Sequence, residues 1–154
     1  AFNWIGDKLL APALVAVVFS GLTNLLLERF KASRDHATKM TEELRADLRE
    51  LQRHAAEYWS RAAGSGDAAI EARMVAGQSD VVATAAQLRE QHKIEVFASA
   101  DELLEFLDAL TGGQFQSANR SADMYRVSRC VLLISKVRAA AARERYKRLR
   151  DRGR

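Results

Sequence analysis

The chain has 154 residues, of which 48% are hydrophobic and 29% are charged. This balance is too apolar for a disordered chain, and the length corresponds to about one domain, which excludes multidomain enzymes. One proline and eight glycines are too few turn formers for a fold of many strands. The single cysteine, Cys130, can form neither an intramolecular disulfide nor a cysteine-based zinc site. The composition therefore predicts one all-α unit and implies no cofactor.

A run without charged residues begins at Leu9 and ends at Leu27, with charged residues directly on both sides. At about 1.5 Å per residue, a helix of this length covers roughly 28 Å, close to the hydrocarbon thickness of a bilayer. A buried core helix would ordinarily keep a polar stripe, which this run lacks. We therefore expect a short stub over residues 1–8 and a single transmembrane helix over residues 9–27.

Basic residues predict the orientation of this span. Those that closely follow the run are Arg29, Lys31, Arg34 and Lys39. On the other side only Lys8 and the amino terminus carry positive charge, and the positive-inside rule places the more basic side in the cytoplasm. The sequence thus predicts a single-pass protein of a bacterial-type inner membrane, with residues 28–154 forming a cytosolic helical bundle.

A cluster of polar and small residues interrupts the otherwise aliphatic span, namely Ser20, Gly21, Thr23 and Asn24. Ser20 and Asn24 are four positions apart and share a face, with Gly21 beside them. Small residues allow close approach between transmembrane helices, and an amide can form a hydrogen bond across the contact. We expect Ser20, Gly21 and Asn24 to associate the spans of different copies, although Asn24 can also simply reach the water of the headgroup region.

Apolar residues recur at steps of three and four beyond the span, which is the helical period. They include Met40, Leu44, Leu48 and Leu51. This pattern predicts one helix from about Leu9 to Ala63, with a coiled-coil-like face that packs in the core or between copies of a homo-oligomer.

Three further helices are predicted after the glycine-rich break at residues 64–66. The second should begin with Asp67 as its N-cap and end near His92. Ser99 and Glu102 match a capping box for a third helix, and the last should run from about Ser121 to near Arg150. Short connections favour antiparallel neighbours, and so an up-down bundle of about four helices is expected.

The basic charge is concentrated in a tail over residues 136–154, which holds nine basic and two acidic residues. The candidates for contact with lipid headgroups or phosphate are Arg143, Arg145, Lys147, Arg148, Arg150 and Arg152. An up-down path would return this tail towards the membrane, where anionic headgroups attract it. Nucleic acid is the weaker alternative, because Tyr146 is the only aromatic residue available for stacking on bases.

Candidate chemistry is sparse, and the chain is not expected to be an enzyme. His36, His54 and His92 are widely separated, and we expect them to face solvent rather than bind metal. The segment from Arg29 to His36 resembles the arginine, six residues, histidine spacing of HEPN-type helical ribonucleases. This resemblance implies an RNA-cleaving helical dimer as one alternative function.

The leading functional hypothesis is a membrane-anchored scaffold that assembles through its span and cytosolic helices. Its partners would be the lipid bilayer, further copies of itself and a larger membrane protein complex. A pore-forming or membrane-disrupting effector of the toxin or antiviral type is the main alternative, since a ring of such spans could conduct ions.

Overall fold

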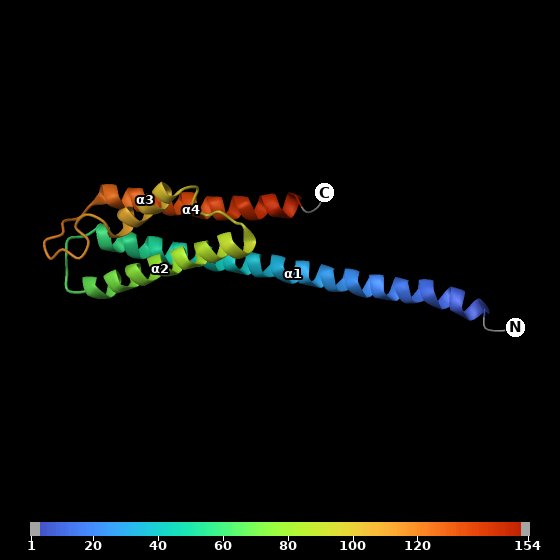
Figure 1. The fold of residues 1–154 in the computed structure, drawn as a ribbon. Coiled ribbons are helices and arrows are strands. Elements are labelled where there is room, and N and C mark those ends of the chain that lie inside the picture. The colour runs from blue at the N-terminus through green and yellow to red at the C-terminus, as the bar shows by residue number, and fades with distance from the viewer. Residues whose placement is uncertain (1–3, 152–154) are drawn as a thin grey trace. The chain divides into compact units, whose positions relative to one another are not determined.

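The computed structural model describes the backbone of residues 4–151 and the side chains of residues 22–144, 146 and 147. All regular structure in this part of the chain is helical (Figure 1). The four helices are α1 (Trp4–Trp59), α2 (Asp67–His92), α3 (Ala100–Thr111) and α4 (Met124–Asp151). The predictions of an all-α chain and of a bundle of about four helices are therefore confirmed.

The chain divides into two compact units, Ala1–Ala37 and Thr38–Arg154. Helix α1 supplies the helix of the first unit and the first helix of the second. The other three helices belong entirely to the second unit, which we call the bundle. The boundary that the sequence predicts between membrane and cytosolic parts, at residue 28, stays a prediction.

Helix α1 ends at Trp59, earlier than the predicted Ala63, because a distant loop binds its last carbonyls. The Asp123 N–H donates to the Trp59 carbonyl at 2.7 Å. The Arg120 guanidinium donates to the carbonyls of Tyr58 and Arg61. The carbonyl groups at a helix end need partners, and here the loop before α4 provides them.

The start of α2 is where predicted, but its cap differs. Gly66 occupies the N-cap position, and no side chain forms a capping hydrogen bond to α2. Asp67 is instead the first residue of the helix, it is buried, and its carboxylate accepts a hydrogen bond from the Gly64 N–H at 3.0 Å. The prediction of Asp67 as N-cap is therefore wrong, because its carboxylate binds the preceding loop.

Helix α2 ends at His92, as predicted, and a left-handed residue follows it. Lys93 has φ of 53°, and its N–H donates to the Arg89 carbonyl. The next N–H, of Ile94, reaches back to the Leu88 carbonyl, and the Ile94 side chain is buried. The Lys93 bond spans four residues, which is the hydrogen bond of the αL motif, here formed without glycine.

The capping box at the start of α3 is confirmed. Ser99 Oγ accepts a hydrogen bond from the Glu102 N–H at 3.2 Å, and the Glu102 carboxylate accepts one from the Ala98 N–H at 2.5 Å. Lys136 of α4 also lies 2.8 Å from the Glu102 carboxylate. The bond from Lys136 is the largest influence that lowers the Glu102 pKa, followed by the bond from Ala98.

Helix α4 begins at Met124 rather than near Ser121. Asp123 caps it, since its Oδ1 accepts a hydrogen bond from the Arg126 N–H at 2.8 Å. Residues 112–123 thus form a longer connection than predicted, and Phe115 from this loop packs on Tyr58 with the ring centroids 5.3 Å apart.

All four helices contribute to the core of the bundle. Its fully buried large side chains include Leu44, Leu48, Leu51, Tyr58, Trp59, Met74, Leu88, Phe106, Leu110 and Ile134. Burial of such side chains is worth about 1.5–3 kcal/mol each relative to exposure, which makes this core the main source of stability. Gly77 of α2 allows close approach to α1, because a Cβ atom built there would lie 3.5 Å from Leu51.

Candidate functional site

The first unit carries a group of exposed apolar side chains on α1. They are Leu22, Leu25, Leu26, Leu27 and Phe30, each more than half exposed. Leu25 and Leu27 lie on nearly opposite faces of the helix, because successive residues are about 100° apart. These side chains therefore cover both sides of α1 rather than one stripe.

Two of the three residues proposed for association of spans lie outside the described side chains. These are Ser20 and Gly21, whereas Asn24 is described and exposed. Within the residues searched, no helix combines the length and the apolar character that crossing a bilayer requires. Most of the predicted span, residues 9–21, precedes the first described side chain.

The face formed by Met40, Leu44, Leu48 and Leu51 is buried within a single chain. None of the four side chains is more than 6% exposed. They pack in the core that α1 shares with the rest of the bundle. A contact between copies that keeps this bundle intact must therefore use other side chains.

The basic tail is described in part. Arg143 and Lys147 are exposed on α4, and Lys147 Nζ lies 2.6 Å from a Glu144 carboxylate oxygen. The side chains of the other four tail candidates lie outside the described residues, namely Arg145, Arg148, Arg150 and Arg152. The described part thus presents two cations of the predicted patch to solvent.

The histidine expectations are partly wrong. His54 and His92 are buried at 6% and 7% exposure, because each lies on the inner side of its helix. Among the described side chains, no group of three histidine, cysteine, aspartate or glutamate residues is placed to hold a metal ion. His36 and Arg29, the pair that resembles the HEPN spacing, are both exposed on α1.

His54 borders a polar groove between α1 and α2 with a volume of about 360 Å³. Three carboxylates and two guanidinium groups also line it, from Asp47, Glu50, Asp80, Arg53 and Arg73. Burial raises the pKa of Asp47, and the charge of Asp80 raises it further. Since the acidic and basic groups nearly balance, the groove lacks the single sign of charge that would select an ion.

A buried charged cluster surrounds Arg120, whose side chain is fully buried. Its guanidinium forms an ion pair of 2.5 Å with Asp67, and Arg61 binds the same carboxylate at 3.0 Å. The guanidinium also lies 3.7 Å from the centre of the Tyr58 ring, a cation–π geometry. This cluster joins the end of α1, the start of α2 and the loop before α4, and it has a structural role.

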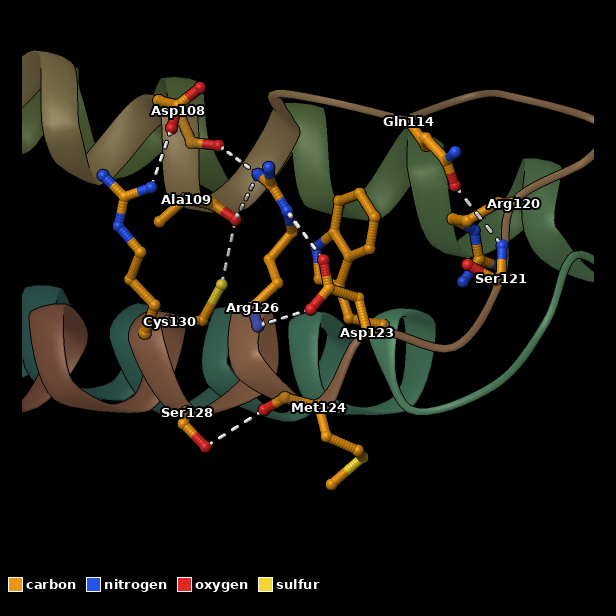
Figure 2. A network of polar contacts seen from close by, with 12 residues as sticks. Asp108, Ala109, Gln114, Arg120, Ser121, Asp123, Met124, Arg126, Ser128 and Cys130 are labelled. Atoms are coloured by element: carbon orange, nitrogen blue, oxygen red, sulfur yellow. Dashed lines mark hydrogen bonds and ion pairs between the residues drawn. The ribbon is translucent and has the colours of Figure 1, made fainter.

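A second polar network joins α3 to α4 (Figure 2). Arg126 donates to the Asp108 carbonyl at 2.6 Å, and Arg129 forms an ion pair of 3.0 Å with the Asp108 carboxylate. Cys130 Sγ lies 3.1 Å from the Ala109 carbonyl. Burial raises the pKa of the Cys130 thiol to about 11. Cys130 is therefore a small buried residue at the contact between α3 and α4.

Sequence reasoning missed both clusters because they depend on pairs far apart in the chain. Arg120 and Asp67 are 53 positions apart, and Asp108 and Arg129 are 21 positions apart. Comparison with protein-family models, curated proteins and solved structures finds no match to this chain.

Proposed function

We propose that this chain is a single-pass membrane protein whose helical bundle lies in the cytoplasm and assembles with further copies as a non-enzymatic scaffold. The observation that carries the proposal is the set of exposed apolar side chains from Leu22 to Phe30. They adjoin the uncharged run that begins at Leu9. A soluble coiled coil would bury one stripe, whereas these side chains point to both sides of α1, as expected for a helix surrounded by lipid.

The direction of α4 supports contact between the basic tail and the membrane surface. Helix α4 begins beside the end of α1, where Asp123 binds the Trp59 carbonyl. It therefore runs antiparallel to the α1 segment of the bundle, and its basic end lies towards the end of the bundle that contains Thr38 (Figure 1). Each Lys or Arg near an anionic lipid surface contributes about 1 kcal/mol to the free energy of binding.

Membrane fractionation tests the anchor. A double substitution of Val17→Arg and Val18→Arg places two charges in the run, and each charge costs about 2.5–3.5 kcal/mol at the centre of a transmembrane helix. We expect the wild-type chain to resist extraction by alkaline carbonate and the double variant to be released. The matched control places Arg at the exposed positions Ala46 and Ser60 and should stay in the membrane. Release of the wild type by carbonate would overturn the proposal.

Two further measurements separate the alternatives. Collapse of the membrane potential on expression, abolished by Asn24→Leu, would assign the chain to the pore-forming class instead. RNA cleavage by the wild-type chain that His36→Ala removes would support the HEPN-type alternative. A scaffold predicts an unchanged membrane potential and no RNA cleavage by either chain.

A further inference from the structure

The outward face of α4 carries an uncharged stripe. Its residues recur at steps of three and four, and they are Tyr125, Ser128, Leu132, Ser135, Ala139, Ala142 and Tyr146. The three large members are 69–79% exposed. They lie opposite the buried face that contains Ile134 and Val137. Because the outermost face of a bundle helix ordinarily carries charge, this stripe is a helix face without its partner.

The outward face of α2 is also uncharged over most of its length, but its side chains are small. The exposed residues on this face include Ala69, Ala72, Ala76, Ser79 and Ala83. Small side chains let another helix approach closely. The two faces are therefore complementary in shape, because large side chains on α4 can pack on the flat surface that the small side chains of α2 form.

The two helices begin at the same end of the bundle. The ion pair between Asp67 and Arg120 joins the first residue of α2 to the loop that leads into α4. Helices α2 and α4 therefore run in parallel, and α3 packs against both of them (Figure 1). Each copy thus presents a stripe with large side chains and a separate small-residue face.

We propose that the outer face of α4 in one copy packs against the outer face of α2 in the next copy, which joins the copies head to tail. This inference rests on the proposed function, because copies anchored in one membrane share their orientation and height. A contact of this kind pairs two different surfaces, and so it continues into a ring or an open row. A two-fold contact between antiparallel α4 helices would invert one copy relative to the membrane.

Charge also favours α2, rather than a second α4, as the helix of the neighbouring copy that packs on the α4 stripe. When the first residues of the two helices, Asp67 and Met124, are set level in the proposed contact, an α2 residue faces the α4 residue 57 positions further along the chain. Glu90 is then level with Lys147, and Asp80 lies between Lys136 and Arg138. Two parallel α4 helices would instead bring the exposed Arg143 of one copy towards Arg143 of the other, and like charges repel.

The apolar positions match in the same register. Tyr125 is level with Ala68, and Leu132 is level with Val75 and next to Ala76. Arg73 approaches Arg129, but Glu105 and Asp108 already form ion pairs with that guanidinium. The register therefore sets Tyr125 against Ala68 and Leu132 beside Ala76, while Tyr146 is level with Arg89, beyond the small side chains of α2.

Cysteine cross-linking of the full-length chain in its membrane tests this contact. Two differently tagged chains, one with Leu132→Cys and one with Ala76→Cys, are expressed together and oxidised. We expect a disulfide-linked pair that contains both tags, while each variant expressed alone stays monomeric on a non-reducing gel. Both positions are exposed, and so neither change disturbs the core. The control replaces Ala76→Cys with Ala46→Cys on the solvent side of α1, and Cys130 is buried in every chain.

A chain that carries both substitutions should give a ladder of dimers, trimers and larger species. Dimers formed by Leu132→Cys alone would indicate an α4–α4 contact and overturn the proposal. A link from Leu132→Cys to a different protein, or no link in any sample, would also overturn it. The same samples are fractionated: a ladder in the soluble fraction would refute the membrane anchor while leaving the α4–α2 contact in place.

Discussion

Arg120 and Asp67 form an ion pair of 2.5 Å in which the arginine side chain is fully buried. The pair joins the first turn of α2 to the loop before α4, and the same guanidinium binds the carbonyls at the end of α1. Three segments that are far apart in the chain therefore meet at one side chain.

Arg120→Met should destabilise the bundle by about 3–5 kcal/mol, because it leaves a buried carboxylate without its main partner. Thermal unfolding followed by circular dichroism measures the effect. Arg53→Met is the matched control, since the ion pair of Arg53 with Glu50 is exposed and worth about 1 kcal/mol at most. Equal losses in the two variants would contradict the structural role given to Arg120.

The Asp67 carboxylate should make the stability of the bundle sensitive to acid. Burial acts to raise its pKa, but hydrogen bonds from the Gly64 N–H and Arg120, with the charge of Arg61, hold the pKa below 3.8. A lowered folded pKa means that this stabilisation is complete above the unfolded value and is lost as the pH falls through the folded value. Asp67→Asn should therefore flatten the decline in unfolding midpoint below about pH 4. An identical acid dependence in the variant would refute this assignment.

Cys130 should react slowly with thiol reagents in the folded chain. Its pKa is raised from 9.0 to about 11, which lowers the fraction of thiolate at pH 8 roughly 100-fold. Burial slows the reaction further. The rate of modification by a disulfide reagent, measured with and without denaturant, checks this expectation. Equal rates in both conditions would show that the thiol is accessible in the native state.

Ser99→Ala should cost about 1 kcal/mol, because the Glu102 N–H would lose its capping oxygen. Ser99→Asp should retain most of the stability, since aspartate also caps helices well. Chemical unfolding of the three chains tests the capping box. A loss that Asp fails to restore would mean that Ser99 acts through another contact.

Neutralising the tail should weaken binding to anionic vesicles. Substituting Gln for Arg143, Arg145, Lys147 and Arg148 removes four cations, each worth about 1 kcal/mol near an anionic surface. Truncation after Lys136 is a poorer test, because it also removes the buried residues Val137 and Ala141. Full-length chains reconstituted in vesicles with and without anionic lipid are compared by protease protection of the tail. Protection that is the same in both lipids would argue against headgroup contact.

Local patterns predicted much of the fold. The capping box of Ser99 and Glu102 placed the start of α3, because both hydrogen bonds lie within five residues. The apolar period placed Leu44 and Leu48 on a buried face. Helix ends that depend on distant partners were less accurate, as at Trp59, where the partner of the last carbonyl is Asp123.

The candidate sites were harder to predict for the same physical reason. Met40 and Leu51 could pack either in the core of their own chain or against a second copy. Which of the two occurs depends on how α2 to α4 pack, and periodicity alone does not determine that packing. The position of His54 in a groove likewise required knowing that Asp80 of α2 lies nearby. The uncharged stripe on α4 became visible only after the buried face of that helix was assigned.

The long-range contacts of the bundle can form only late in the synthesis of the chain. Tyr58 is translated 62 residues before Arg120, which binds its carbonyl. Until α4 has left the ribosome, the core of the bundle lacks the last of its helices, which contributes Ile134 and Val137. Nascent chains with uncovered apolar surface aggregate readily, and so this protein should depend on chaperones during the last third of its synthesis.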